Sequence, residues 1–317
     1  MRYRKLGTSG LEVSVLGLGT NAFGGRADKE TSIRVLHRAA DSGITFIDTA
    51  NIYTGTKSEE IIGEAFQGRR QDVLLATKAG IKNGEGPNAG GASRQHIFRE
   101  VEASLRRLRT DYIDLYQIHV FDSQTPLEET LRALDDLVRS GKVRYVGASN
   151  YSAWQMMKSL AISDSRHLIR YASVQPGYSL ADRGVERELV PFCVDQGIGL
   201  IPYFPLAGGI LTGKYSGGAV PSGSLLDKNP NFARRLNADR VELGEQVARI
   251  AAEIGTSATA LSLAWLMHQP AVSTVIAGAT RESQIDENLK AVELELSEDV
   301  LLALDEASKN FVFAPPF

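Results

Sequence analysis

The chain has 317 residues, of which 43% are apolar and 23% are charged, as is ordinary for a globular protein. Its 35 lysines and arginines against 38 aspartates and glutamates give a net charge of −3, which excludes the basic composition of a typical nucleic-acid-binding domain. The single cysteine, Cys193, excludes an intrachain disulfide and any metal site built from several cysteines. The N-terminal sequence MRYRKLGTSG lacks the apolar core of a signal peptide, and no apolar run reaches the ~18–20 residues of a membrane span. We therefore expect a cytoplasmic protein without a membrane or nucleic-acid partner; the oligomeric state has no signal in the sequence.

Short apolar runs alternate with helical patterns along the whole chain. Strands that are covered on both faces have this composition. We expect eight of them, over residues 13–20, 45–49, 73–78, 113–119, 143–149, 172–175, 200–203 and 274–277. Eight β-then-α units without a break in composition predict an α/β fold, a single (β/α)8 TIM barrel domain over residues 1–317. An N-terminal β-hairpin around residues 7–10 precedes the barrel, and an extra C-terminal helix over 298–308 follows it.

The helices between these strands have recognisable start and stop signals. Ser93 is expected to cap one helix, and Gly43 ends the first long helix just before the second strand. Thr125-Pro126-Leu127-Glu128 has the pattern of a capping box with proline at the first helical position. The region 206–239 is long and rich in Gly, Pro, Asn and Ser, and loops of that length inside a compact fold are usually functional.

A glycine motif near the N-terminus imitates a dinucleotide-binding fingerprint. Gly17-Leu18-Gly19-Thr20-Asn21-Ala22 fits G-x-G-x-x-A, but that motif works only where a helix starts at the glycines. Here the helical pattern starts only near Asp28, so we reject a Rossmann domain. We interpret the glycines as positions where the backbone approaches a ligand at the barrel mouth.

Three ionisable residues end three successive predicted strands: Asp48, Lys78 and His119. The C-terminal ends of the strands are where barrel enzymes carry their catalytic groups. A charge that projects into this layer is costly unless it is paired, and Asp48 and Lys78 on adjacent strands can pair with each other. Tyr53 follows Asp48 by five residues, on the loop above the same strand. Each of the four alone has an ordinary structural explanation, but their joint position at one end of the barrel favours a catalytic site.

The four side chains suit the reduction of a carbonyl group. A phenol has a pKa near ~10, and the ammonium of Lys78 should lower that of Tyr53 and make it a better proton donor. His119 could hydrogen-bond the carbonyl oxygen of the substrate. Such a site still needs a source of hydride.

The remaining histidines give no indication of a metal site. They lie on predicted helices or beside them and are interpreted as surface or packing residues: His37, His96, His167 and His268. No second histidine or carboxylate stands at metal-ligand spacing from His119, so we predict that the site holds no metal. Cys193 is interpreted as a packed apolar residue.

Around these four residues the sequence resembles the aldo-keto reductases over nearly its whole length. The similar segments are GLGT at 17–20, IDTANIY at 47–53, LLATKAG at 74–80, DYIDLYQIH at 111–119, GKVRYVGASN at 141–150, VQP at 174–176, PYFPLAGGILTGKY at 202–215 and IAGATRESQIDENL at 276–289. The resemblance implies a catalytic tetrad of Asp48, Tyr53, Lys78 and His119 that reduces aldehydes or ketones, with Tyr53 as the proton donor. It also implies NAD(P)H bound across the C-terminal mouth of the barrel.

The resemblance further implies which residues contact the cofactor. Ser149, Asn150 and Gln175 would bind the nicotinamide amide, and Tyr203 would stack on its ring. The segment 206–214 would lie near the pyrophosphate and 278–288 around the adenosine. The full expected set is Gly19, Thr20, Asp48, Ser149, Asn150, Gln175, Tyr203, Phe204, Leu206, Ala207, Gly209, Lys214, Ile276, Gly278, Ala279, Thr280, Arg281, Gln284, Glu287 and Asn288. Arg281, at the start of a helix, could bind a 2′-phosphate, which favours NADPH over NADH.

Two positions depart from the family's common pattern. Phe204 stands where Ser is common before Pro-Leu, which removes one expected contact to the pyrophosphate. Thr54 stands where Gly often follows the tyrosine, which could narrow the entrance. The substrate, a small carbonyl compound, would be selected by loops 82–93, 121–124 and 216–234, with Phe23 lining the pocket.

Three other functions stay open at this point. The same site could run in the oxidative direction as an NAD(P)-linked sugar dehydrogenase. The chain could be a cofactor-binding regulatory subunit with low turnover, since channel β-subunits of this family look alike at the tetrad. We expect no channel-blocking role, because no extension precedes the hairpin. An unrelated barrel hydrolase or lyase is disfavoured by the lack of a paired-carboxylate motif.

Overall fold

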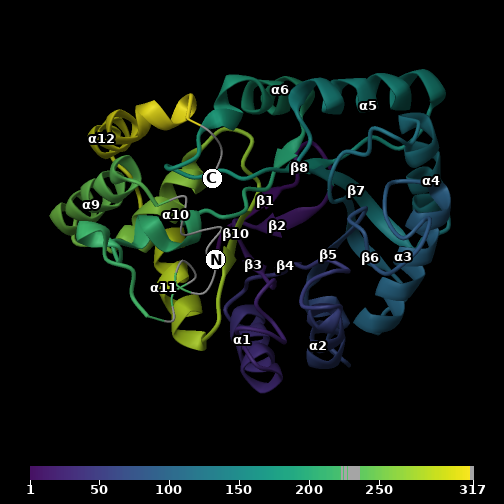
Figure 1. Cartoon of the computed structure of the whole chain (residues 1–317), viewed down its shortest axis with the longest axis horizontal. Helices are drawn as coiled ribbons and strands as arrows, with labels where there is room; N and C mark the ends of the chain where they lie inside the picture. Colours follow the sequence, from purple (N-terminus) through teal and green to yellow (C-terminus); the bar gives the residue numbers. More distant parts are fainter. Residues whose placement is uncertain (223, 225–226, 228–235, 315–317) are drawn as a thin grey trace.

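Eight parallel strands form one curved sheet, and helices surround it (Figure 1). The computed structural model describes residues 1–222, 224, 227 and 236–314. The strands are β3 (Leu16–Gly19), β4 (Phe46–Asp48), β5 (Leu74–Ala79), β6 (Ile113–Ile118), β7 (Val143–Ser149), β8 (Ser173–Gln175), β9 (Gly199–Leu200) and β10 (Val275–Gly278). Their order in the sheet is β10-β3-β4-β5-β6-β7-β8-β9, so each strand from β3 to β9 pairs with the next along the chain.

The sheet curls round so that its first and last strands meet. A parallel bridge joins Leu200 of β9 to Val272, just before β10. The Ser273 amide donates to the Leu200 carbonyl at 2.9 Å, and the Ile276 amide donates to the Pro202 carbonyl at 2.9 Å. The sequence-based prediction of a (β/α)8 barrel is thereby confirmed.

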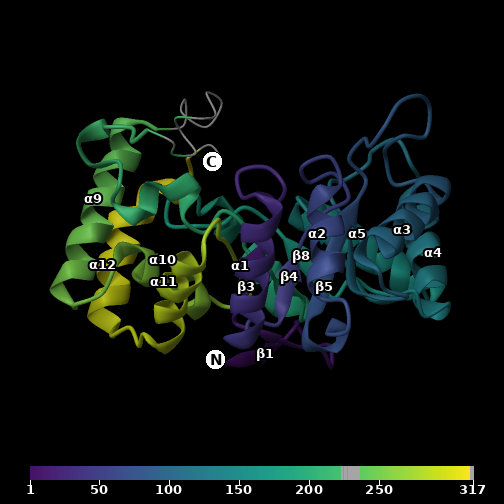
Figure 2. The ribbon, with the colours of Figure 1, turned by 90° about the horizontal axis from the view of Figure 1, so that it is seen from below.

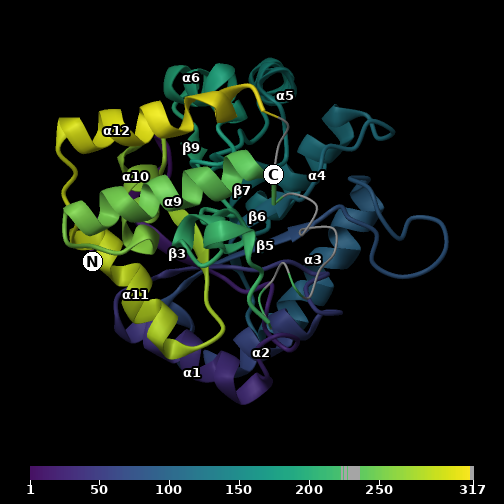
Figure 3. The same cartoon turned by 60° about the vertical axis from the view of Figure 1, so that its left-hand side comes forward.

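Helices connect the strands in the predicted alternation. They are α1 (Lys29–Asp41), α2 (Lys57–Ala65), α3 (Arg94–Leu108), α4 (Leu127–Arg139), α5 (Ala153–Arg166), α6 (Leu189–Gln196), α9 (Ala238–Glu253), α10 (Ala258–His268), α11 (Glu282–Glu293) and α12 (Glu298–Ser308). The predicted C-terminal helix is α12, which packs beside α9 (Figure 3). Among the described residues, no single helix is both long and apolar enough to cross a membrane; α9 and α10 meet that test only together, as a pair bent by 94°.

A β-hairpin closes one end of the barrel. Strands β1 (Tyr3–Lys5) and β2 (Glu12–Ser14) pair antiparallel, so the predicted strand over 13–20 was wrong at its start. The apolar run is continuous, but its first part pairs with β1 and only Leu16–Gly19 joins the barrel. Leu6 and Val13 are buried against Phe46, inside the barrel. Figure 2 shows β1 at the opposite end of the barrel from the loop between β5 and α3.

The helix starts were predicted with mixed success. The Ser93 hydroxyl accepts a hydrogen bond from the His96 amide and caps α3, as expected. The capping box at Thr125 was wrong, because the Thr125 hydroxyl donates to Asp122 at 2.7 Å and α4 begins after Pro126. The predicted loops 206–239 and 216–234 lie partly outside the described residues.

Candidate active site

The charged groups at the strand ends form a buried ion pair. Asp48 is the last residue of β4, and Lys78 lies near the end of the neighbouring β5. The Lys78 ammonium is 2.7 Å from Asp48 Oδ2 and donates to the Thr49 carbonyl at 2.7 Å. Both side chains are buried, so each charge depends on the other to offset its loss of hydration.

Tyr53 and His119 adjoin this ion pair. Tyr53 lies in the turn segment after β4, and its hydroxyl is 3.4 Å from Lys78 Nζ. The rings of Tyr53 and His119, which directly follows β6, meet edge to face with centroids 6.0 Å apart. The four residues predicted to act together therefore lie side by side.

The electrostatics of Tyr53 differ from the sequence-based prediction. Burial is the largest influence and raises the pKa of the phenol; Lys78 lowers it, as predicted, but by less, and Asp48 raises it again. The net pKa therefore lies above the usual ~10. Burial is the largest single influence on Lys78 and opposes its charge, but Asp48 and Tyr53 together outweigh burial, and the pKa of Lys78 is raised. The free protein thus holds a protonated phenol next to a protonated lysine.

His119 is held as a neutral imidazole. Burial, and then the charge of Lys78, lower its pKa to about 3. Its backbone amide donates to the Ala79 carbonyl at 2.8 Å, which fixes the residue at the end of the barrel. Its Nδ1 is buried without a partner among the described residues. A neutral imidazole can donate a hydrogen bond from one ring nitrogen and accept one at the other.

Two glutamines orient the Asp48 carboxylate. Gln175 Nε2 donates to Asp48 Oδ1 at 2.8 Å, and Gln117 Nε2 lies 3.4 Å from the same atom. The sequence gives no role to Gln117, although its alternation with His119 along β6 places both on the interior face. Among the described residues no donor reaches Gln175 Oε1, so this oxygen remains as an acceptor for a ligand amide.

The other residues expected at the nicotinamide form a hydrogen-bonded chain. Asn150 Nδ2 donates to the His119 carbonyl at 2.9 Å and lies 3.0 Å from Ser149 Oγ. The Ser149 hydroxyl in turn donates to the Gln175 carbonyl at 2.9 Å. The Tyr203 hydroxyl donates to Asn150 Oδ1 at 2.8 Å. The chain leads from Asp48 to Tyr203 around the mouth, a polar rim of the kind that a carboxamide requires.

The glycines of β3 have a packing explanation. A Cβ on Gly19 would lie 2.8 Å from Ile276 Cγ2, and one on Gly17 would lie 2.8 Å from Ile276 Cδ1. Both positions must therefore lack a side chain whether or not a ligand approaches. The hydroxyl of Thr20 already has hydrogen-bond partners within the protein, since it donates to the Asp48 carbonyl at 2.9 Å and accepts from the Ser58 hydroxyl.

The residues expected at the adenosine form a second group. Gly278 of β10 is level with Gly19, which is level with Asp48 on the next strand. The chain then continues through Ala279 into α11, where Gln284 Oε1 accepts the Thr280 amide at 2.7 Å. The expected contact residues on α11 and at its start have different surroundings. Arg281 is exposed and Asn288 is buried, whereas the Glu287 carboxylate is already bound by Ser257 and Lys290.

The loop after β9 has an unusual backbone. Phe204 and Ala207 have φ values of 52° and 47°, in the left-handed region that is uncommon for such residues. Leu206 precedes the 3₁₀ segment Ala207–Thr212, and the Lys214 ammonium lies over Gly209, where a Cβ would collide with it. This curled segment stands beside Tyr203 and presents Lys214 at the surface.

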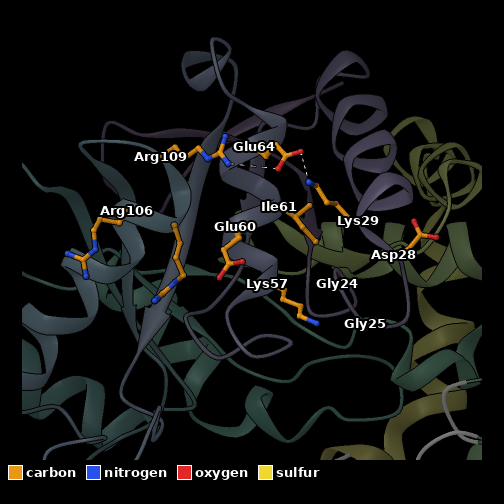
Figure 4. Close-up of a pocket in the computed structure, with 11 residues that line it drawn as sticks. Gly24, Gly25, Asp28, Lys29, Lys57, Glu60, Ile61, Glu64, Arg106 and Arg109 are labelled. Atoms are coloured by element: carbon orange, nitrogen blue, oxygen red, sulfur yellow. Dashed lines mark ion pairs between the residues drawn. The ribbon is translucent and has the colours of Figure 1, made fainter.

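A pocket of about 690 Å³ lies elsewhere, between α1, α2 and the end of α3 (Figure 4). None of the tetrad lines it. Its Glu64 carboxylate binds Lys29 at 2.8 Å and lies 3.9 Å from Arg109, the two ion pairs drawn in the figure. We therefore do not take it as the active site.

The described residues contain no group of three or more His, Cys, Asp or Glu side chains placed to hold a metal ion. Cys193 is buried, and burial raises the pKa of its thiol to about 12. It is a packed residue, as the sequence indicated.

A sequence profile of the aldo/keto reductase family matches residues 15–309. The chain is 41% identical to a probable voltage-gated potassium channel subunit beta of Arabidopsis thaliana, over 93% of this chain and 92% of that protein. It is 36% identical to the aldo-keto reductase YhdN of Bacillus subtilis, over 90% and 87%. It is 34% identical to versiconal hemiacetal acetate reductase of Aspergillus parasiticus, over 96% of both. The chain belongs to the aldo/keto reductase family, whose members are oxidoreductases that generally use nicotinamide cofactors.

Proposed function

We propose that the protein is an NAD(P)H-dependent reductase that converts aldehydes or ketones to alcohols, with Tyr53 as the proton donor. The observation that carries this proposal is the Tyr53 hydroxyl 3.4 Å from Lys78 Nζ, which Asp48 holds at 2.7 Å. A buried, protonated phenol beside a fixed cation is suited to give up a proton only as negative charge develops on the substrate oxygen.

A nicotinamide cofactor, when bound in its reduced form, would supply the hydride that the chain itself lacks. Tyr53 donates its proton to the carbonyl oxygen, and Lys78 stabilises the phenolate that remains. His119, neutral and adjacent to Tyr53, donates a hydrogen bond to the same oxygen and orients it. Asp48 holds Lys78 in position, and the glutamines hold Asp48. In this scheme each member of the tetrad has one role.

The polar rim would hold the nicotinamide amide. Gln175 offers its Oε1, and Asn150 and Ser149 lie next to it along the same hydrogen-bonded chain. Arg281, exposed at the start of α11, would bind a 2′-phosphate and favour NADPH. Its Nε donates to Ser283 Oγ, a neutral partner, at 3.1 Å.

The raised pKa of Tyr53 supports the reductive direction. Reduction needs a protonated phenol, which is the form that burial favours. Oxidation of an alcohol by the same residues needs the phenolate as a base, which burial disfavours. We therefore place the NAD(P)-linked sugar dehydrogenase second.

The direct test is the Tyr53→Phe variant, assayed with NADPH and 4-nitrobenzaldehyde. Loss of the general acid should lower kcat by about 10²- to 10⁴-fold. Binding of NADPH, followed by fluorescence, should change little. Tyr3→Phe serves as the matched control, because its hydroxyl binds the Gly43 carbonyl on the hairpin side of the barrel. A Tyr53→Phe variant with wild-type kcat would reject Tyr53 as the acid.

The similarity to a probable channel subunit beta favours one other function, a cofactor-binding regulatory subunit that turns over slowly. The same tetrad would then report the redox state of the cofactor. Single-turnover mixing of the NADPH-bound protein with the aldehyde distinguishes the two. A reductase releases NADP⁺ and turns over repeatedly, whereas a sensor retains it after one slow turnover.

A further inference from the structure

Glu100 is a buried carboxylate on α3 that the proposed chemistry does not use. It is 4% exposed, yet its Oε2 accepts two side-chain amides. Asn51 Nδ2 donates to this oxygen at 2.8 Å, and Asn83 Nδ2 donates to it at 3.1 Å. The other oxygen, Oε1, lies 3.3 Å from Nε of Arg99, whose side chain is about half exposed. One buried atom thus joins two loops of the barrel mouth.

The first of these loops carries Tyr53. Asn51 lies between Asp48 and Tyr53, and its backbone amide donates to the Lys78 carbonyl at 3.2 Å. Beyond Tyr53, the residues Thr54, Gly55 and Thr56 all have positive φ, at 50°, 64° and 79°. Threonine rarely adopts this conformation, because its branched Cβ crowds the backbone there. A loop with this backbone keeps its shape only where tertiary contacts hold it.

Side-chain hydrogen bonds tie the residues on either side of Tyr53 to other parts of the chain. The Thr54 hydroxyl donates to the Phe23 carbonyl at 2.5 Å, and Asn51 donates to Glu100. They lie on opposite sides of Tyr53. The Asn51–Glu100 bond is the buried one, and a buried donor that loses its acceptor is costly.

The second loop follows Lys78. The backbone amide of Asn83 donates to the Ala89 carbonyl at 2.7 Å, and the backbone amide of Gly91 donates to the Gly80 carbonyl at 2.8 Å. The loop 80–91 therefore folds back on itself. The Asn83 side chain ties this folded loop to Glu100. Residues 82–93, which were expected to help select the substrate, overlap this loop.

The surroundings of Glu100 keep it an acceptor. Burial acts to raise its pKa, but hydrogen bonds from Asn51 and Asn83, with His96 and Arg99 nearby, outweigh burial and lower it. At neutral pH the group is therefore a carboxylate with no proton to donate. An exposed glutamate could not hold two amides in one geometry without competition from water.

We propose that Glu100 is a positioning residue that holds the Tyr53 loop, through Asn51, against the loop that follows Lys78. It sets the distance between Tyr53 and the reacting carbonyl without touching either. The inference rests on the proposed role of Tyr53, since positioning matters only if Tyr53 is the acid.

The decisive comparison is between Glu100→Ala and Glu100→Gln. Both asparagines bind the same oxygen, so glutamine can place its single Oε1 there and keep both bonds. Alanine leaves both amides unpaired. We expect Glu100→Ala to lower kcat by about 10- to 100-fold, because small displacements of a catalytic group have effects of that size. Glu100→Gln should restore kcat to within about threefold of the wild type, and NADPH affinity should change little in either variant.

Glu102→Ala is the matched control, because Glu102 lies on the same helix but forms an exposed ion pair with Lys142. It should leave kcat unchanged. If Glu100→Gln is as impaired as Glu100→Ala, the charge of Glu100 matters and positioning through the two amides is rejected. If Glu100→Ala keeps wild-type kcat, the proposal also fails.

Asn51→Ala and Asn83→Ala separate the two arms and serve if Glu100→Ala does not fold. Asn51→Ala should lower kcat with little change in KM, whereas Asn83→Ala should mainly raise KM. Equal effects on both parameters in both variants would indicate general loosening and overturn the proposal. Tyr53→Phe is measured alongside. If it is fully active the proposed function fails, whereas an inactive Tyr53→Phe with an unaffected Asn51→Ala refutes only the positioning role.

Discussion

The Lys78 ammonium lies 2.7 Å from Asp48 Oδ2, and the two side chains are 0% and 4% exposed. Asp48 is paired in register with Ala76 of β5, two residues before Lys78, so the rigid ladder between β4 and β5 sets the position of both groups. The pair lies in the barrel interior, where an ion is stable only if its partners satisfy it. Under the proposed function, stability and catalysis would depend on the same contact.

Asp48→Asn should destabilise the fold as well as lower activity. The amide has one oxygen, but Lys78 Nζ and Gln175 Nε2 both need an acceptor at this position. Breaking a buried ion pair costs about 3–5 kcal/mol. We expect a loss of that size in the free energy of unfolding, measured with urea. Glu128→Gln, in an exposed pair with Arg132, should cost less than about 1 kcal/mol. Equal losses would mean that burial of the Asp48–Lys78 pair is unimportant.

The pH profile of reduction should be flat across the neutral range. The pKa of His119 is lowered to about 3 by burial and Lys78, so the imidazole is neutral throughout. The pKa of Tyr53 is raised by burial, so the phenol stays protonated well into the alkaline range. We expect kcat/KM for the aldehyde to be constant between about pH 5 and 9 and to fall only above about pH 10.

A decline centred between about pH 7 and 9 would contradict this expectation. It would mean that Lys78 outweighs burial once the cofactor is bound, as the sequence alone had suggested. Lys78→Met provides the comparison, since it removes the cation next to the phenol. Its kcat should be low at every pH, and a profile that regains activity in alkali would assign the titration to another group.

The barrel could be predicted from the sequence because each strand is a short apolar run followed by a helical pattern. The strand boundaries could not be predicted where two elements are both apolar. The run over 13–20 contains Val13, a hairpin residue whose side chain packs inside the barrel, and Leu18, which lies in the barrel sheet. Only the pairing of residues 12–14 with β1 separates them, and pairing is a long-range property that composition does not encode.

The four residues of the tetrad could be predicted for the same reason, since the end of a strand can be recognised from its pattern. The contacts around the tetrad could not be predicted. Gln117 lies in an ordinary strand pattern and Glu100 in an ordinary helical pattern, and only the folded chain shows that they bind Asp48 and Asn51, respectively. The direction in which the pKa of Tyr53 is shifted could not be predicted either, because it depends on how deeply the loop is buried.

Arg281→Ala should weaken NADPH binding and leave NADH binding unchanged. A hydrogen bond between a guanidinium and a phosphate contributes about 1.5–3 kcal/mol, which corresponds to an increase of about 10-fold or more in the NADPH dissociation constant. Binding is measured by fluorescence titration with each nucleotide. The control is Arg34→Ala, an exposed arginine of α1 that pairs with Glu282 beside this position. An unchanged ratio of the two affinities would remove Arg281 from the cofactor site.

Asp122→Ala should alter the choice of substrate more than the rate of the chemical step. Asp122 lies on the loop after His119, and its carboxylate accepts the Ala92 amide at 2.8 Å and the Thr125 hydroxyl at 2.7 Å. It therefore joins two of the loops that were predicted to select the substrate.

The loss of these bonds should lower the free energy of unfolding by about 1–3 kcal/mol and loosen both loops. Across a panel of aldehydes of increasing size, we expect KM to change unevenly while kcat stays within about threefold, because the tetrad is held by the barrel and by other contacts. Asp136→Ala, an exposed carboxylate of α4 paired with Arg94, is the control. A uniform fall in kcat with unchanged KM values would instead place Asp122 among the groups that position His119.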